Sequence, residues 1–61
     1  MKMTAENLWL GGNELIIRFR NGTHVVLESY EDYEVVFQGK YEECVKYCEK
    51  RWIEYEESII G

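Results

Sequence analysis

The chain has 61 residues and a formal net charge of −5, from 12 acidic and 7 basic side chains. This length allows a single domain, and a hydrophobic share of 46% with 15% aromatic residues argues against a disordered chain. The negative charge argues against direct binding to nucleic acid or to an anionic membrane, because clustered lysine and arginine side chains bind phosphate groups. A protein with a basic surface is the partner that this charge favours.

The sequence predicts a cytoplasmic protein. No apolar run approaches the roughly 18 residues that a membrane-spanning helix needs. The start, Met1-Lys2-Met3, also lacks the apolar stretch of a signal peptide.

The first part of the chain, residues 1–13, is expected to form an N-terminal segment. Leu8-Trp9-Leu10 is a short apolar run, and Gly11-Gly12-Asn13 after it is a turn signal. The apolar run is either a short additional strand or a plug that folds back onto the sheet.

Residues 14–38 are expected to form a three-stranded antiparallel meander, with strands at 14–20, 23–30 and 33–38. The first of them alternates apolar and polar side chains, and Asn21-Gly22 after it is a strong hairpin signal. Glu31-Asp32 turns the chain between the second and third strands.

Two registers are compatible with the hairpin at Asn21-Gly22. A two-residue turn pairs Ile17 with Val26 and places Glu28 on the core face. A three-residue loop pairs Ile17 with Val25 and Leu15 with Leu27, and it keeps Glu28 out of the core. The hydrophobic pattern favours the three-residue loop. A second three-residue loop at residues 30–32 then pairs Leu27 with Val35 and Val25 with Phe37. The expected core face reads Leu15, Ile17, Phe19, Val25, Leu27, Tyr33, Val35 and Phe37.

The stretch 41–59 is expected to form one amphipathic helix. Its apolar positions recur at intervals of four and three residues, which is helical spacing; they are Tyr41, Val45, Cys48, Trp52, Tyr55 and Ile59. Lys40 stands where a capping Ser, Thr or Asp is usual, so the predicted cap is weak. The fold expected is therefore α+β: a three-stranded, or with Leu8-Trp9-Leu10 four-stranded, antiparallel meander with one C-terminal helix packed on one face.

No constellation of residues points to catalysis or to a cofactor. Cys44 and Cys48 are one helical turn apart, which gives poor disulfide geometry, and with His24 they do not supply the four ligands of a zinc site. We interpret the two cysteines as small core residues. His24 has no nucleophile or paired acid beside it. The sequence predicts a protein that is not an enzyme and has no metal or cofactor.

Two surfaces are candidates for binding another protein. The favoured register lines up Ile16, Val26 and Val36 across the outer face of the sheet, near Arg18, His24 and Tyr30. This row either stabilises the sheet through cross-strand pairs or is covered by a partner. The second candidate is an acidic surface that consists of Glu28, Glu31, Asp32, Glu34, Glu43, Glu54 and Glu57.

The junction between the last strand and the helix, Tyr33 to Tyr47, resembles a pattern in small phage- and prophage-encoded accessory proteins of the ββα or βββα kind. In this pattern a strand ends in aromatic-x-Gly, here Phe37-Gln38-Gly39, and Tyr-Glu-Glu opens the helix, here Tyr41-Glu42-Glu43. The resemblance implies a small protein that binds and modulates a host or phage protein. Some such proteins are anti-CRISPR or anti-restriction factors.

Three functions therefore follow as expectations. The first is a non-catalytic protein-binding module that acts as a modulator or inhibitor. The second is an acidic mimic of nucleic acid that inhibits a DNA- or RNA-binding protein. The third is a structural homodimer in which outer sheet faces or edge strands meet.

Overall fold

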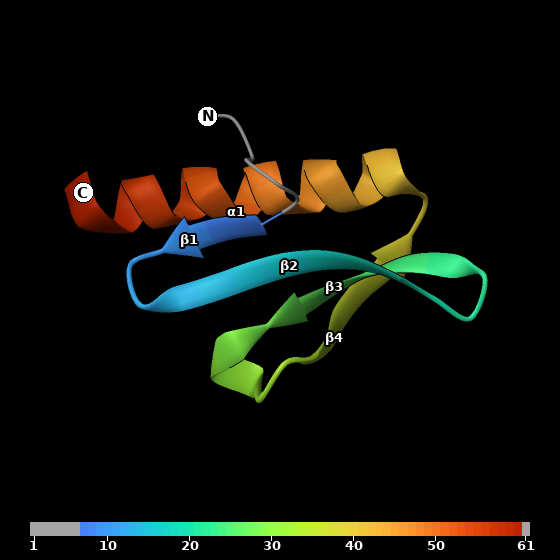
Figure 1. Ribbon diagram of the computed structural model, residues 1–61. Coiled ribbons are helices and arrows are strands. Elements are labelled where there is room, and N and C mark those ends of the chain that lie inside the picture. The colour runs from blue at the N-terminus through green and yellow to red at the C-terminus, as the bar shows by residue number, and fades with distance from the viewer. Residues whose placement is uncertain (1–6, 61) are drawn as a thin grey trace.

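The computed structural model describes residues 7–60, and side-chain surroundings are described up to Ile59. Four strands precede one helix: β1 (Asn7–Leu10), β2 (Asn13–Arg20), β3 (Thr23–Glu28) and β4 (Glu34–Gly39), then α1 (Tyr41–Ile60). A short 3-10 turn, η1 (Ser29–Glu31), connects β3 to β4. The strands pair in chain order, β1-β2-β3-β4, and every pair is antiparallel. This arrangement confirms the α+β meander with a C-terminal helix (Figure 1).

The apolar run at the start of the described residues is a strand and not a plug. Leu8 pairs with Leu15, and Leu10 pairs with Asn13 across the turn at Gly11-Gly12. Gly11 has a φ of +67°, a conformation that glycine adopts without steric cost. The sheet therefore has the fourth strand that the sequence left open.

The register between β2 and β3 differs from the expectation. The turn at Asn21-Gly22 has two residues, both with positive φ (50° and 81°), which is the geometry of a type I′ hairpin turn. Ile17 pairs with Val26 and Leu15 pairs with Glu28. The predicted three-residue loop is wrong. A shift of one residue sends every side chain of β3 to the opposite face, so Val26 faces α1 while Val25 and Leu27 face away.

The pairing of β3 with β4 is partly as expected. Leu27 pairs with Val35, as predicted, but Val25 pairs with Gln38 and Val26 pairs with Phe37. The register shifts between Val26 and Leu27, which makes Val36 the additional residue of a β-bulge. The bulge allows both Val36 and Phe37 to pack against the core.

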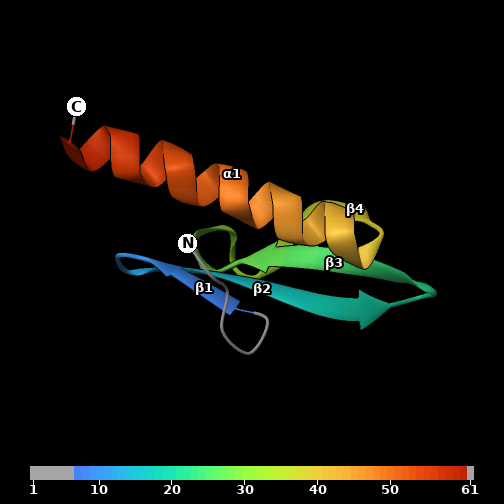
Figure 2. The same cartoon turned by 90° about the horizontal axis from the view of Figure 1, so that it is seen from above.

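The helix α1 covers one face of the sheet and leaves the other face without a helix among the described residues (Figure 2). The core lies between them and consists of Leu8, Leu10, Leu15, Ile17, Val26, Cys44 and Cys48, with Val36, Phe37, Val45, Tyr47, Trp52 and Tyr55 packed around it. Phe37 stacks on Tyr47 with ring centroids 4.9 Å apart.

Several side chains expected in the core lie elsewhere. Phe19 is 66% exposed, and Tyr33 and Val35 are about half exposed. Val25 and Leu27 are buried, but on the face away from α1. Cys44 has no exposed surface and is a central contact of the helix.

The first turn of α1 is stabilised by the side chain of Glu43, which bonds back to Lys40. The backbone N–H of Lys40 donates to Oε1 of Glu43 at 2.8 Å. This contact is the glutamate half of a capping box. Glu43 therefore supplies one of the two hydrogen bonds of a capping box.

Candidate functional site

An apolar strip crosses the sheet face that lies away from α1, hereafter the outer face. Ile16 pairs with Leu27, and Leu27 pairs with Val35, so these three side chains form one row across β2, β3 and β4. We call them the outer row. Ile16 and Leu27 are 9% and 5% exposed, whereas Val35, on the edge strand, is 43% exposed. At the β4 edge of the sheet, the outer row therefore ends in an apolar side chain that is partly exposed to solvent.

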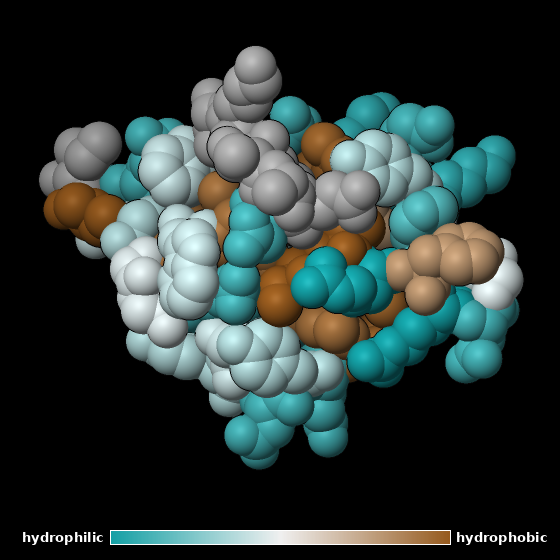
Figure 3. Space-filling model, viewed as in Figure 1, coloured by the Kyte–Doolittle hydropathy of each residue, from teal (hydrophilic) through white to brown (hydrophobic). Residues whose placement is uncertain are grey.

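Trp9 extends the strip on the other edge of the sheet. It pairs with Glu14, and Asn7 on the same strand pairs with Ile16, so Trp9 is the diagonal neighbour of Ile16 on this face. The Trp9 side chain is 56% exposed. Figure 3 shows apolar side chains at the centre of the molecule in this view, with hydrophilic side chains around them.

The two ends of the outer face carry opposite charge. At one end Glu14 accepts hydrogen bonds from Asn7 Nδ2 at 2.6 Å and from the Tyr33 hydroxyl at 3.3 Å. Partial loss of hydration, together with the Glu14 carboxylate, raises the pKa of Tyr33, which keeps the phenol a neutral donor. At the other end lie Arg18 and Arg20, both exposed. Glu14 and the two arginines are on β2, on the same side as Ile16.

The structure separates the six residues predicted to form a binding sheet face. Ile16 and Arg18 lie on the outer face, as expected. Val26 is fully buried under α1 and Val36 packs against the core, so their placement on the outer face is wrong. The two-residue turn gives the observed pairing, and that pairing brings in Leu27 and Val35 instead.

His24 and Tyr30 also lie away from the outer row. His24 pairs with Phe19 and is on the helix side of the sheet. Its ring lies edge-on between Phe19 and Tyr41, with centroid distances of 5.0 and 5.4 Å. Tyr30 is in η1, where its N–H donates to Asn13 Oδ1 at 3.0 Å. The prediction that His24 lies beside Arg18 on the outer face is therefore wrong.

The predicted acidic surface is divided. Glu28 is 8% exposed and points under α1, so it does not belong to a surface. Glu43 is engaged at the start of α1. The remaining members are exposed and lie in two places, Glu31, Asp32 and Glu34 at the β3–β4 connection and Glu54 and Glu57 on α1.

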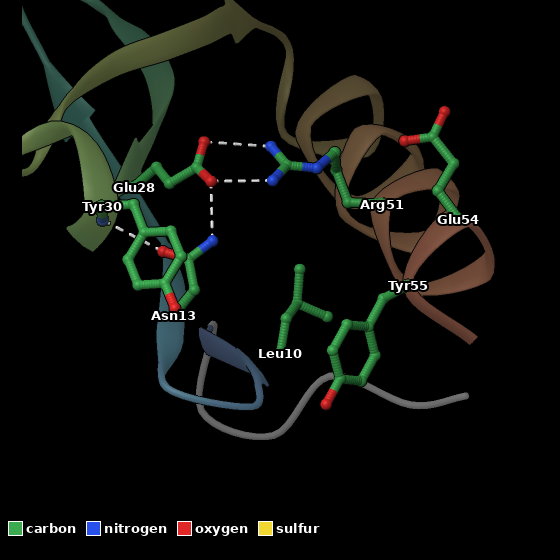
Figure 4. A pocket seen from close by; sticks show the side chains of 7 residues that line it. All are labelled: Leu10, Asn13, Glu28, Tyr30, Arg51, Glu54 and Tyr55. Atoms are coloured by element: carbon green, nitrogen blue, oxygen red, sulfur yellow. Dashed lines mark hydrogen bonds and ion pairs between the residues drawn. The ribbon is translucent and has the colours of Figure 1, made fainter. Parts of the chain in front are cut away.

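Glu28 forms an ion pair with Arg51 at the edge of the core (Figure 4). Arg51 Nη1 donates to Oε1 at 3.0 Å and Nη2 donates to Oε2 at 2.7 Å, and Asn13 Nδ2 donates to Oε2 at 2.6 Å. The hydrogen bond and charge of Arg51 lower the pKa of Glu28, against the opposing effect of burial. Arg51 also donates to the Tyr47 hydroxyl at 3.1 Å.

A hollow of about 350 Å³ lies beside this pair, between Leu10, Tyr30, Glu54 and Tyr55. It is large enough for a small ligand. However, the carboxylate and the guanidinium in its wall are bonded to each other, and a carboxylate with a lowered pKa is a weak base. We interpret the pair as structural.

The cysteines offer no reactive thiol. Burial raises the pKa of Cys44, and it raises the pKa of Cys48 to about 11, so both thiols stay protonated at neutral pH. Neither forms a disulfide, and both are buried. Among residues 7–60, no group of His, Cys, Asp and Glu side chains is arranged to hold a metal ion.

Comparisons with known proteins add no assignment. No protein-family model matches the sequence, and neither curated proteins nor solved structures gave a match. The resemblance of the strand-to-helix junction to phage accessory proteins stays a prediction. In the part of the chain that the structure describes, no helix is both long enough and apolar enough to cross a bilayer.

Proposed function

We propose that this protein is a non-catalytic protein-binding module, and that it binds through the outer face of its sheet. The observation that carries the proposal is the strip formed by Trp9 and the outer row. Its two edge members, Trp9 and Val35, are 56% and 43% exposed, although one-sided antiparallel sheets usually present polar side chains to water.

The composition of this face is that of a protein interface. Interface centres are apolar and enriched in aromatic residues, and their rims are polar. Here Trp9 and Val35 supply the exposed apolar side chains, with the already buried Ile16 and Leu27 between them, and Glu14 and Arg18 supply part of the rim. An exposed tryptophan is also a frequent hot spot of binding energy. A host or phage protein, as the resemblance implies, is one partner of this kind.

The test is a capture experiment in which tagged protein is mixed with a bacterial lysate and with untagged copies of the chain. Val35→Glu places a charge in the strip at a site that is already 43% exposed, so the fold should tolerate it. Ile53→Glu is the matched control, because Ile53 is 55% exposed but lies on α1. Val26→Glu would not serve as a test of this face, since Val26 is fully buried.

Proteins captured by the wild type and by Ile53→Glu, but lost with Val35→Glu, would support binding through the outer face. The captured set should survive a wash at high salt, because apolar contacts are little affected by screening. Capture that is unchanged by Val35→Glu would refute the proposed face. Circular dichroism of each variant checks that the fold is intact.

A further inference from the structure

The charges on β2 are arranged so that the outer face is complementary to itself. Glu14, Ile16 and Arg18 are consecutive outward-facing positions of this strand. Ile16 is therefore the midpoint between an acidic and a basic side chain. A strand of this pattern matches a reversed copy of itself: when Ile16 faces Ile16, each Glu14 faces the Arg18 of the other chain.

We propose that the partner of the outer face is a second copy of this chain, packed sheet against sheet with the strands of the two copies antiparallel. This inference rests on the proposed function and names its partner. The two-fold axis runs along the outer row, so that Ile16, Leu27 and Val35 each lie opposite the same residue of the second copy. Such an interface is isologous, the usual form in homodimers.

The charged side chains select the antiparallel arrangement. If the strands of the two copies ran in the same direction, Glu14 would face Glu14 and Arg18 would face Arg18, and like charges in contact are unfavourable. In the antiparallel arrangement both pairs are attractive. Stacked sheets lie about 10 Å apart, which glutamate and arginine side chains can span together.

Arg18 is free for this contact within the described residues. Its Nη1 donates to the neighbouring carbonyl of Ile17 at 3.1 Å, and the ion pair found among the described residues is that of Arg51 with Glu28. Glu14 accepts from the neutral donors Asn7 and Tyr33. Trp9 pairs with Glu14, so an arginine that reaches Glu14 from the second copy also lies beside an exposed indole, a favourable neighbour for a guanidinium.

The size of the face sets the expected strength of the dimer. Four strands about 4.8 Å apart, with four to six residues of about 3.3 Å each, span at most roughly 400 Å² per copy, and Ile16 and Leu27, which are 9% and 5% exposed, add little to the area that a second copy can still bury. Stable interfaces bury about 800 Å² per partner. We therefore expect a dimer that forms in the micromolar range and dissociates on dilution.

The experiment is sedimentation equilibrium on the full chain at several concentrations, with two charge-reversal variants. Glu14→Arg sets two positive side chains against each other at both ends of the dimer, and Arg18→Glu sets two negative side chains against each other there. For each variant alone, the dissociation constant of the dimer should be higher than that of the wild type by a factor of about ten or more. An equimolar mixture of the two should dimerise again, because both cross-chain pairs are then of opposite charge.

The rescue by mixing keeps the test independent of folding, since a variant that failed to fold would not dimerise in the mixture. Lys50→Glu and Glu57→Arg, on the exposed surface of α1, control for the changes in net charge of Arg18→Glu and Glu14→Arg, respectively. A wild type that stays monomeric at high micromolar concentration would overturn the inference, and so would a dimer that is insensitive to both reversals. If the wild type is monomeric but Val35→Glu still abolishes capture of a lysate protein, the proposed function survives and only the second copy is excluded.

Discussion

Removal of the Glu28 carboxylate should cost this domain a large part of its stability. The carboxylate accepts hydrogen bonds from both terminal nitrogens of Arg51 and from the amide of Asn13, at 2.6–3.0 Å. The side chain of Glu28 is 10% exposed and that of Arg51 is 26% exposed. In Glu28→Ala the guanidinium and the Asn13 amide lose their acceptor at a place that water reaches only in part.

The expected magnitude lies between two limits. Breaking a fully buried ion pair from one side costs about 3–5 kcal/mol, and an exposed pair contributes about 0–1 kcal/mol. With one partner nearly buried and the other a quarter exposed, we expect Glu28→Ala to lose about 2–3 kcal/mol. A domain of this size has about 3–5 kcal/mol in total, so the variant should be folded with little reserve.

Urea unfolding followed by tryptophan fluorescence measures this loss. With a slope of about 1 kcal/mol per molar urea for so small a domain, the midpoint should fall by about 2–3 M. Glu34→Ala is the matched control, because Glu34 pairs with Glu28 across the strands but is exposed. Its midpoint should change by less than about 0.5 M. A loss in Glu28→Ala no larger than that of the control would refute the reasoning.

A double replacement separates the energetic contribution of the ion pair from the cost of removing the carboxylate alone. Glu28→Leu/Arg51→Leu removes both charges together and leaves neither of them uncompensated, so most of the lost stability should return. If the double variant loses the sum of the two single losses, the side chains act independently and the pair has no special energetic role.

Three further predictions follow from the same structure. The pKa of Glu28 is lower in the folded chain than in the unfolded one. The contribution of Glu28 to the free energy of unfolding is therefore complete above the ordinary glutamate pKa, and it is lost as the pH falls from about 4.5 through the lowered value. Over this interval, urea unfolding should show a larger loss of stability for the wild type than for Glu28→Gln. Cys44 and Cys48 have no exposed surface and raised pKa values, so a thiol reagent should label them only at the rate of unfolding, and fast labelling in the native state would contradict their burial. Gly22→Ala should cost about 1 kcal/mol through its φ of +81°, whereas Gly12→Ala should be neutral or slightly stabilising, since an added Cβ would meet only the Tyr30 hydroxyl at 3.9 Å; equal effects in thermal unfolding would contradict this.

The elements of the fold are readable from the sequence because their patterns are local. Apolar residues three and four positions apart predict the helix, and the structure extends it by one residue, to Ile60. The turn signals Gly11-Gly12 and Asn21-Gly22 both lie at two-residue connections between paired strands. Such signals depend on neighbouring residues, which a sequence displays directly.

The register is not readable in the same way. β3 carries Val25, Val26 and Leu27 in succession, so either face of this strand can be the apolar one. The predicted register was chosen because it keeps Glu28 out of the core. Glu28 is accommodated on the core face by its ion pair with Arg51, 23 residues further along the chain. No local pattern connects the two residues.

The same dependence explains why the candidate site was only partly predicted. A row across three strands was expected and exists, but one residue of slip replaces Val26 and Val36 by Leu27 and Val35 as partners of Ile16. Ile16 was placed correctly because β2 alternates clearly. The exposure of Trp9 and its position beside Ile16 depend on β1, which the sequence left open as either a fourth strand or a plug.

The ion pair of Glu28 with Arg51 and the two-residue turn at Asn21-Gly22 both match the observed register, in which Leu27 and not Val26 lies on the outer face. In the observed register Glu28 is paired under α1, and Leu27 lies on the outer face. In the slipped register Glu28 would reach solvent, Leu27 would enter the core, and Arg51 would lack its acceptor. Burial of apolar side chains distinguishes these two registers poorly. In one register Val26 faces the core, and in the other Val25 and Leu27 face it. We therefore expect the pair to add to the preference of the turn for the observed register.

The two partners of the pair should therefore respond differently to replacement. Arg51→Leu leaves the Glu28 carboxylate unpaired under the helix, and a slip of one residue relieves this by moving it to water; nuclear Overhauser contacts of Ile17 should then shift in part from Val26 to Val25. Glu28→Leu removes the carboxylate itself, so a slip would bring no buried charge to water, and the contacts with Val26 should remain. If Arg51→Leu only lowers stability and keeps the Ile17–Val26 contacts alone, the type I′ turn fixes the register without the pair.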